Sequence, residues 1–365
     1  MAAGRAVGRR WPVGPAAPGA HGGQAMSSKP TLKQRIRLVL TWLIGLGLLG
    51  WLMHKLDWSV LPQILSRIDA AIWLGAAACI VVSYAFRASR MQLVLVEPHE
   101  RRGRILPSRA VWRVMLIHNA AINLLPMRGG ELSFPWLARR ELGQPVSRSV
   151  AALMWMRIQD LGVLLLLAAL AWPGLSLAVH AALVAVWLLG VVLLQPVAGR
   201  VLRLLVPTAS VQATGWRKAA GALRAALEEP SHNHPLTWFC TLGNWAVKLA
   251  AGSAMLAAVC HVSFGTGWAG AVGGELTAIL PIQGPASLGT YEAGVKGGMA
   301  WIAGLGAAAP QEAVLGALAW HLMLIAASVI GAALAGFSHL RAAAAGPEDA
   351  AGARDPKQGD NSAPV

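Results

Sequence analysis

Charge is scarce inside the apolar stretches of this chain, and its scarcity excludes an ordinary soluble domain. Only 13% of the 365 residues are charged, 56% are hydrophobic and the mean hydropathy is +0.53. Several apolar runs reach the roughly 20 residues that cross a bilayer as a helix. The sequence therefore predicts an all-α polytopic membrane protein. Its full spans, about six, are expected near 37–54, 70–86, 150–172, 176–195, 235–261 and 312–337.

Several common signatures are also missing. The sequence has no GxxxxGK(S/T) loop, no GxGxxG after a strand, no GxSxG and no HExxH. ATP-driven, dinucleotide-dependent and the common hydrolytic mechanisms therefore lack support. The three cysteines fall within predicted spans, which argues against a disulfide framework. His180 and His321 have no second ligand at metal spacing. We expect no metal, no cofactor and no enzymatic activity.

Acidic residues are half as frequent as basic ones, 16 against 31. The basic residues collect on one side of the predicted spans, within 1–40, 87–113, 138–149, 196–234 and the tail from 338. By the positive-inside rule, both termini are cytoplasmic and the membrane is the bacterial inner membrane. We attribute the net charge of +15 to these loops and to an anionic leaflet. No nucleic acid is expected as a partner. The sequence favours a headgroup-facing patch for Arg87, Arg90, Arg101, Arg102 and Arg104.

Eight ionisable residues remain inside apolar stretches once loops and ends are set aside. They are Arg128, Arg157, Lys248 and Lys296, balanced by Glu131, Asp160, Glu275 and Glu292. An ionisable group at bilayer depth costs about 2.5–3.5 kcal/mol on insertion scales, so it marks a site or a pathway by default.

Two segments broken by proline and glycine fit neither a full span nor a loop. Residues 109–137 leave one basic loop and return to another, with one span of apolar sequence before Pro126. Residues 268–306 begin and end at uncharged turns and are interrupted midway by Pro281, Gly284, Pro285 and Gly289. We predict two re-entrant hairpins in inverted orientation. Non-helical backbone at membrane depth must be buried or line a wet cavity, so the hairpins predict an internal polar chamber.

The two broken segments share a Leu-Pro-x-x-Gly pattern with an acid downstream. Interrupted segments at corresponding places in two halves are typical of a transport site. Chance is the alternative in a chain with 40 glycines and 21 prolines.

A longer set of motifs joins these segments. His118-Asn119 leads to Asn123-Leu124-Leu125-Pro126-Met127-Arg128-Gly129-Gly130-Glu131, followed by Arg157-x-x-Asp160 and then by Pro281 through Gly289 to Glu292. In these motifs the chain resembles the lysylphosphatidylglycerol synthase/flippase transmembrane-domain family, over about residues 36–337. The second motif departs from the family pattern at Ala286-Ser287 and Thr290-Tyr291. Synthase members add a soluble aminoacyl-transfer domain. This chain ends in a short tail, so the resemblance implies a stand-alone membrane region that does not aminoacylate lipid.

The candidate substrate-binding residues suit a lipid headgroup. Arg128 and Arg157 carry a fixed charge and a planar fork of donors that matches a phosphate. Glu131 follows two glycines whose N–H groups are able to cradle an anion. Glu292, beside Tyr291, is able to pair with a headgroup amine or to carry a proton. The remaining candidates are polar residues of the same segments, namely His118, Asn119, Asn123 and Asp160.

Purely structural interpretations compete with these roles. Arg157 and Asp160 are three residues apart and Glu292 and Lys296 four apart, so each couple is able to form a local ion pair. Lys248 and Glu275 have opposite signs and are a candidate pair. His118, Asn119 and Asn123 are as consistent with hydrogen-bonded packing as with ligand contact.

The domain organisation follows from these assignments. Residues 1–35 are expected to be a disordered basic extension, 36–337 the flippase-like transmembrane domain, and 338–365 a disordered cytoplasmic tail. Residues 56–69 and 198–228 look amphipathic and are predicted to lie on the membrane surface.

The sequence favours a flippase that moves a phosphate-containing lipid headgroup across the membrane. The lipid is an anionic phospholipid, an aminoacyl-lipid, a hopanoid or a polyprenyl phosphate. The alternative is a non-catalytic membrane partner for a separate lipid-modifying enzyme, which would dock on residues 196–234. A third hypothesis is an intramembrane transferase that uses Glu131 and His118 as acid and base. No sequence motif supports it.

Overall fold

The structure, a computed structural model, describes residues 59, 62, 66, 68–96, 106–172, 174–205, 215–279, 285–303 and 312–344. For residues 126–128, 205, 230, 285, 302–303 and 338–344 it describes the backbone alone. All described residues belong to one compact unit, which is helical and has no strand in these ranges. The predicted terminal segments 1–35 and 345–365 lie outside them, as does most of 56–69.

Among the described residues, five helices are long and apolar enough to cross a membrane. They are α3 (Ala70–Leu95), α7 (Val146–Leu170), α8 (Leu177–Leu205), α10 (Pro235–Cys260) and α13 (Ala313–Ala344). They confirm five of the six predicted spans, and the sixth, 37–54, lies outside the described residues. Polar residues begin several helices as expected. Asp69 Oδ1, for example, accepts a hydrogen bond from the N–H of Ala71 at 2.8 Å.

Two predicted boundaries were wrong. Helix α3 continues to Leu95 rather than ending at 86, because Arg90 is neutralised inside the protein and does not need to reach water. Helix α8 continues through Pro196 to Leu205. The predicted amphipathic segment 198–228 thus begins in the end of α8 and includes α9 (Gly215–Leu227), with residues 206–214 outside the described residues; its place on the membrane surface stays a prediction.

The first broken segment folds as a helical hairpin. Helix α5 (Arg109–Leu124) leads into a 3-10 turn, η1 (Pro126–Leu132), and then into α6 (Ser133–Leu142). Pro126 ends the α-helical pattern because it lacks an N–H. Gly130 is required at the tip, since a Cβ there would collide with the backbone of Ala121 in α5.

The second broken segment also folds as a hairpin, from α11 (Phe264–Thr277) through η3 (Pro285–Ser287) to α12 (Thr290–Ala303). Its two helices pack backbone to backbone. A Cβ on Gly294 would collide with the carbonyl oxygen of Gly273, and one on Gly298 with that of Ala269. The turn departs from usual geometry at Ala286 and Ser287, whose φ angles are 52° and 56°. They are two of the four positions at which the sequence departs from the family pattern, the others being Thr290 and Tyr291.

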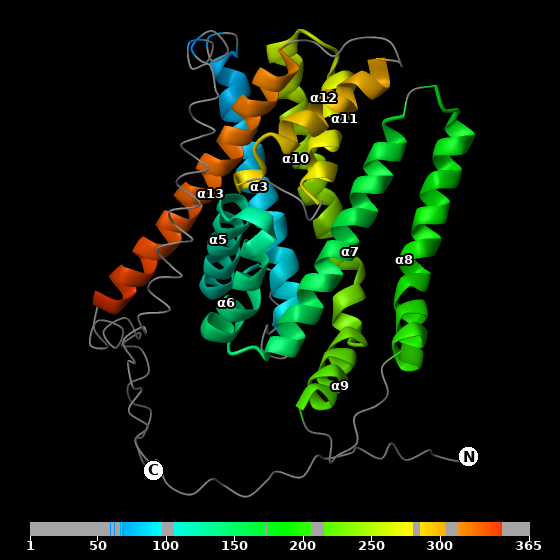
Figure 1. The fold of residues 1–365 in the computed structure, drawn as a ribbon, viewed down its shortest axis with the longest axis vertical. Helices are drawn as coiled ribbons and strands as arrows, with labels where there is room; N and C mark the ends of the chain where they lie inside the picture. Colours follow the sequence, from blue (N-terminus) through cyan, green and yellow to red (C-terminus); the bar gives the residue numbers. More distant parts are fainter. Residues whose placement is uncertain are drawn as a thin grey trace, which may run out of the picture. The chain divides into compact units, whose positions relative to one another are not determined.

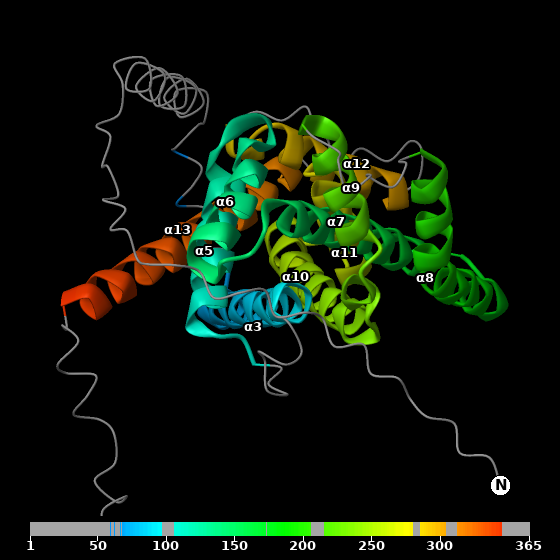
Figure 2. The same ribbon diagram turned by 90° about the horizontal axis from the view of Figure 1, so that it is seen from below.

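The two hairpins point toward each other from opposite ends of the helical unit. In Figure 1, α5 and α6 occupy the lower half and α11 and α12 the upper half. Their tips meet, because η3 lies against both η1 and α5. Helix α10 forms the centre and packs against α3, α7, α11 and α13. Figure 2 shows α3 and α10 lying side by side.

Candidate functional site

Two polar cavities lie where the hairpins meet the long helices. The first, here the hairpin-1 cavity, has a volume of about 20 Å³ and is bordered by residues of α3, α5 and α7. The second, the hairpin-2 cavity, has about 60 Å³ and is bordered by residues of α3, α5, α10, α11, α12 and α13 and by Ser287 of η3. Arg87 of α3 borders both. The predicted polar chamber is therefore two small compartments on either side of one guanidinium group.

The hairpin-1 cavity has an excess of positive charge. Its lining includes the guanidinium groups of Arg87, Arg90 and Arg157, against the single carboxylate of Asp160. Arginine remains charged even when buried, and its fork of donors matches the oxygens of a phosphate. This cavity is therefore suited to an anion.

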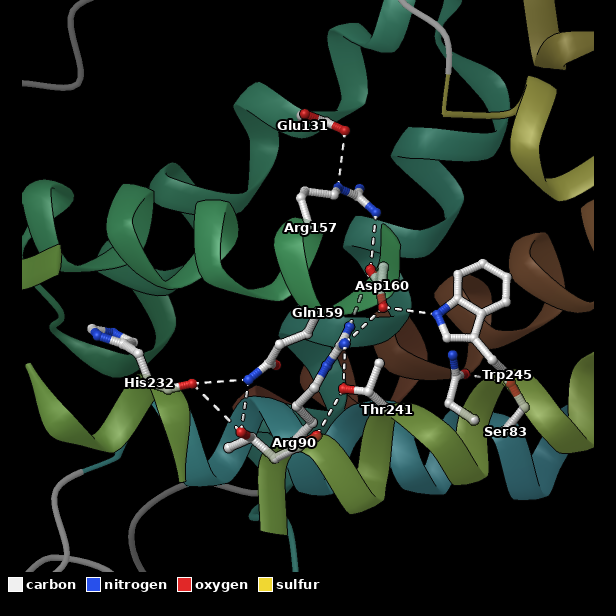
Figure 3. Close-up of polar contacts among 11 residues, drawn as sticks. Ser83, Arg90, Glu131, Arg157, Gln159, Asp160, His232, Thr241 and Trp245 are labelled. Carbon is white, nitrogen blue, oxygen red and sulfur yellow. Dashed lines mark hydrogen bonds and ion pairs between the residues drawn. The ribbon is translucent and has the colours of Figure 1, made fainter. Parts of the chain in front are cut away.

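A buried ion pair forms the deep wall of that cavity. Arg90 Nη1 lies 2.7 Å from Asp160 Oδ1 and donates to Thr241 Oγ1 at 2.8 Å. The indole N–H of Trp245 donates to the same carboxylate oxygen at 2.9 Å. Both charged side chains are about 95% buried, at 4% and 5% exposure. The contacts join α3, α7 and α10, as Figure 3 shows.

Arg157 connects this wall to the tip of the first hairpin. Its Nε lies 3.1 Å from Glu131 Oε1, and its Nη1 lies 3.5 Å from Asp160 Oδ2. The dashed lines of Figure 3 run from Glu131 through Arg157 to Asp160 and Arg90. The side chains of Arg157 and Glu131 are 29% and 24% exposed. The anticipated Arg157–Asp160 pair exists, but it is the weakest link of a four-residue chain.

The lower part of Figure 3 shows why the wall is fixed. Gln159 Nε2 donates to the carbonyl oxygen of His232 at 3.0 Å and to Thr237 Oγ1 at 2.8 Å. These bonds tie α7 to the start of α10. His232 lies in the turn before α10, and burial lowers the pKa of its imidazole, which is therefore neutral.

The hairpin-2 cavity contains a second buried ion pair. Lys248 Nζ lies 2.7 Å from Glu275 Oε1, which confirms the pairing predicted for these two residues. Tyr291 donates its hydroxyl proton to the same oxygen at 3.2 Å. The ammonium group also lies 5.1 Å from the centre of the Trp245 ring, a favourable cation–π contact.

Glu292 has a different partner from the one its spacing suggested. Its Oε1 lies 2.8 Å from Nδ1 of His321 in α13, and its Oε2 accepts the backbone N–H of Gly289 at 2.6 Å. Within the described residues, no ion pair links Glu292 to Lys296, which is exposed on the next turn. The local-pair interpretation is wrong for this couple.

The other predicted site residues divide between the two cavities. His118 and Asn119 line the hairpin-1 cavity, whereas Asn123 and Tyr291 line the hairpin-2 cavity. His118 Nδ1 also lies 3.1 Å from Ser133 Oγ, which joins α5 to the start of α6. The side chain of Arg128 lies outside the described residues, so its proposed role stays a prediction.

Sequence reasoning missed three residues of the cavities. Arg87 and Arg90 were assigned to a headgroup-facing patch, but Arg90 is 3% exposed and both line cavities. His321 was considered as a metal ligand, not as a cavity residue; it is buried, at 6% exposure, and borders the hairpin-2 cavity. The usable signal was the Arg87-x-x-Arg90 spacing, which puts both guanidinium groups on one face of a continuing helix. Arg101, Arg102 and Arg104 lie outside the described residues.

Metal binding has no visible support in the part of the chain that the structure describes. No group of three or more His, Cys, Asp or Glu side chains there is placed to hold an ion. Cys79, Cys240 and Cys260 are free thiols, as predicted.

Comparison with known proteins gives one match. The model of the family described as "Lysylphosphatidylglycerol synthase TM region" matches residues 36–332. No curated protein and no solved structure matches the chain. The matched segment contains both hairpins and all residues that line the two cavities.

Proposed function

Because the chain belongs to the lysylphosphatidylglycerol synthase TM region family, whose membership indicates a membrane lipid-related function, we propose that it moves a phosphate-bearing lipid headgroup across the bilayer. One observation carries the proposal. Three guanidinium groups and one carboxylate line the hairpin-1 cavity, where the first hairpin meets α3 and α7. Glu131, outside the lining, is paired with Arg157, and the one positive charge that remains in excess at membrane depth is costly unless an anion is bound there at some stage of function.

Arg157 is the group best placed to exchange partners. Its contact with Glu131 is three-quarters buried, whereas the Arg90–Asp160 pair behind it is about 95% buried. Removing one partner of a deeply buried pair costs several kcal/mol, about 3–5, but a partly exposed pair is worth about 1 kcal/mol or less. A phosphate therefore displaces Glu131 from Arg157 and leaves the Arg90–Asp160 wall intact.

The hairpin-1 cavity must enlarge to admit a headgroup. Its volume of about 20 Å³ is close to the space that one water molecule needs. Release of Glu131 frees the tip of the first hairpin from α7, and this is the movement we propose for opening. The structure then corresponds to an occluded state, with the headgroup site closed.

The opposed hairpins provide the second half of the mechanism. We propose that both are re-entrant and that they enter the membrane from opposite sides, because inverted interrupted segments characterise alternating-access transporters. Since the tips meet, a headgroup passing Arg87 would leave one compartment and enter the other. We propose, from the excess of basic residues in the loops, that both termini are cytoplasmic and that the membrane is a bacterial inner membrane.

The substrate class follows from the charges of both compartments. The hairpin-1 cavity suits a phosphate diester, as in phosphatidylglycerol, an aminoacylated derivative, a hopanoid-linked phosphate or a polyprenyl phosphate. The carboxylate of Glu275 lines the second compartment, and that of Glu292 lies directly behind its lining residue His321; a headgroup amine would pair with these carboxylates. We propose transport without chemical conversion and without a cofactor.

The test is lipid flipping in liposomes that hold the purified protein. Fluorescent phosphatidylglycerol and a lysyl-modified analogue would be followed by dithionite quenching. We expect flipping above empty liposomes, and loss of at least about tenfold in Arg157→Gln and Arg87→Gln, since removal of a charged hydrogen bond costs about 1.5–3 kcal/mol. Arg128→Gln tests whether Arg128, which the sequence predicts to bind the headgroup phosphate, is also required for flipping.

Arg113→Gln is the matched control. Arg113 lies in the same hairpin and pairs with Glu141 at 2.7 Å, but it does not line the cavity. It should flip lipid at the normal rate. Normal flipping by Arg157→Gln and Arg87→Gln would show that the hairpin-1 cavity has no role in transport.

One observation favours the alternative of a docking protein. Helix α9 exposes Trp216, which is 75% exposed, together with Arg217 and Lys218. If the chain serves as a partner for a lipid-modifying enzyme, Trp216→Ala with Lys218→Glu would abolish its cellular effect, and the cavity variants would not.

A further inference from the structure

The carboxylates of the two cavities differ in the kind of cation that faces them. Asp160 faces Arg90, Glu131 faces Arg157 and Glu275 faces Lys248, at 2.7, 3.1 and 2.7 Å. These partners are guanidinium or ammonium groups. Glu292 faces the imidazole of His321 at 2.8 Å, and within the described residues no Lys or Arg forms an ion pair with it.

Histidine is the side chain whose charge ordinarily changes between pH 5 and 8. The two groups share a hydrogen bond, so a proton taken up belongs to the pair rather than to either residue. We infer that the His321–Glu292 pair is a proton-binding site, and that the protein couples headgroup movement to movement of a proton. The inference rests on the proposed function and names its coupling ion.

The pair lies beside a cavity with room for water, and it contacts the tip of the second hairpin. His321 borders the hairpin-2 cavity, whose volume of about 60 Å³ holds several water molecules. Its ring lies 4.5 Å from that of Tyr291, at an angle of 34°. On the other side, Glu292 accepts the N–H of Gly289, at the end of the second hairpin's turn. A proton entering from the cavity therefore changes a bond made directly to the hairpin tip.

The remaining ionisable groups of the cavity come from four packed elements. They are Tyr84 and Arg87 of α3, Lys248 of α10, Glu275 of α11 and Tyr291 of α12. Helix α5 contributes Asn123, which does not titrate. Lys248 and Arg87, which is shared with the hairpin-1 cavity, oppose the negative charges of Glu275, in the lining, and of Glu292, hydrogen-bonded to His321. One added proton makes the net charge of this group of residues more positive by one unit.

This change of charge determines the direction of coupling. A wall that gains a positive charge binds an anionic headgroup better, and a bound anion favours proton uptake in turn. A monoanionic lipid and one proton then cross together, with no net charge moved. The protein should act as a symporter of protons and anionic lipid.

A sodium ion is a poorer fit to the same site. Sodium needs several oxygen ligands, but the carboxylate oxygens of Glu292 already face the Gly289 N–H and the His321 ring nitrogen. Those of Glu275 face an ammonium group and a hydroxyl. The surroundings present donors, which suit a protonatable carboxylate rather than a metal cation.

The experiment uses the full chain in liposomes with fluorescent phosphatidylglycerol and a pH-sensitive dye inside. A pH difference of about one unit should shift the distribution of the lipid between leaflets by up to about tenfold for one proton per lipid. The dye should report proton entry that depends on the lipid. A sodium gradient of the same size should have no effect.

His321→Gln separates coupling from flipping. Glutamine is still able to donate a hydrogen bond to Glu292 but binds no proton. We expect this variant to flip lipid without any response to the pH difference. Lys296→Gln is the matched control, since Lys296 is exposed on the same helix as Glu292 and one turn away. It should respond as the unaltered protein does.

The outcomes separate the two proposals. Flipping that ignores the pH difference in the unaltered protein, or a response retained by His321→Gln, would overturn proton coupling and leave the flippase proposal standing. No flipping of either lipid would overturn both. Infrared titration of the protein in lipid gives an independent measurement, because the pair should add a carboxylic acid or imidazolium signal on acidification. That signal must be missing in Glu292→Gln and in His321→Gln.

Discussion

The two hairpins have the same outline but differ in the length of chain over which their helices are in close backbone contact. In the first, hydrogen bonds run from His118 to Ser133 and from Ser133 to the carbonyl of Gly130, and Glu131 is held by Arg157 from outside the hairpin. In the second, α11 and α12 are in direct backbone contact at Gly273, Gly294 and Gly298. Polar contacts are exchangeable for water or ligand, whereas close packing is not loosened without forming a void. The comparison identifies the first hairpin as the mobile one.

The largest effect is expected at the wall behind the first hairpin. Arg90→Leu leaves Asp160 buried with only its weak Arg157 contact and one indole donor, and should lower the free energy of unfolding by about 3–5 kcal/mol. Denaturation of the purified protein in detergent measures this. Replacing both residues, as Arg90→Leu with Asp160→Leu, should recover most of the loss. A single variant as stable as the unaltered protein would contradict the buried pair.

Glycine packing in the second hairpin gives the next largest effect. Gly298→Ala places a methyl group against the carbonyl of Ala269 and should cost about 1–3 kcal/mol. A Cβ on the neighbouring Gly297 would have no atom within 4 Å, so Gly297→Ala is the control and should stabilise the helix by about 0.5–1 kcal/mol. Thermal unfolding in detergent compares them. Equal behaviour would show that α11 and α12 are not in backbone contact.

Glu131→Gln is expected to separate stability from transport. Its contact with Arg157 is partly exposed, so the free energy of unfolding should fall by no more than about 1 kcal/mol. The same change releases Arg157, and binding of phosphatidylglycerol should become stronger. Lipid binding and unfolding are measured on the same preparation. Weaker lipid binding would mean that Glu131 contacts the lipid instead of competing with it.

The smallest effect concerns the turn of the second hairpin. Ala286 and Ser287 have positive φ angles, which favour glycine. Ala286→Gly should therefore raise the free energy of unfolding by up to about 1 kcal/mol. Ala293→Gly, inside α12, should instead lower it by about 0.5–1 kcal/mol. A loss of stability in both would show that the turn carries no strain.

The sequence predicted the structural features that depend on a local pattern of residues, namely the spans and the turn of the first hairpin. Apolar runs located five spans, and Pro126 with Gly130 located the turn of the first hairpin, since such residues act on their own stretch of backbone. The sequence-based prediction failed for Arg87 and Arg90, because an arginine after an apolar run is typical of a loop. The carboxylate that pairs with Arg90, Asp160, is 70 residues away. His321 was missed for the same reason, since its partner, Glu292, is 29 residues away.

Arg87 has a thermodynamic consequence of its own. Its guanidinium group borders both compartments, so an anion bound in one changes the electrostatic potential in the other. By linkage, the factor by which bound lipid changes proton uptake must equal the factor by which a proton changes lipid binding. Titrating lipid at two pH values and titrating protons with and without lipid should therefore give the same coupling factor. Arg87→Gln should reduce this factor equally in both titrations.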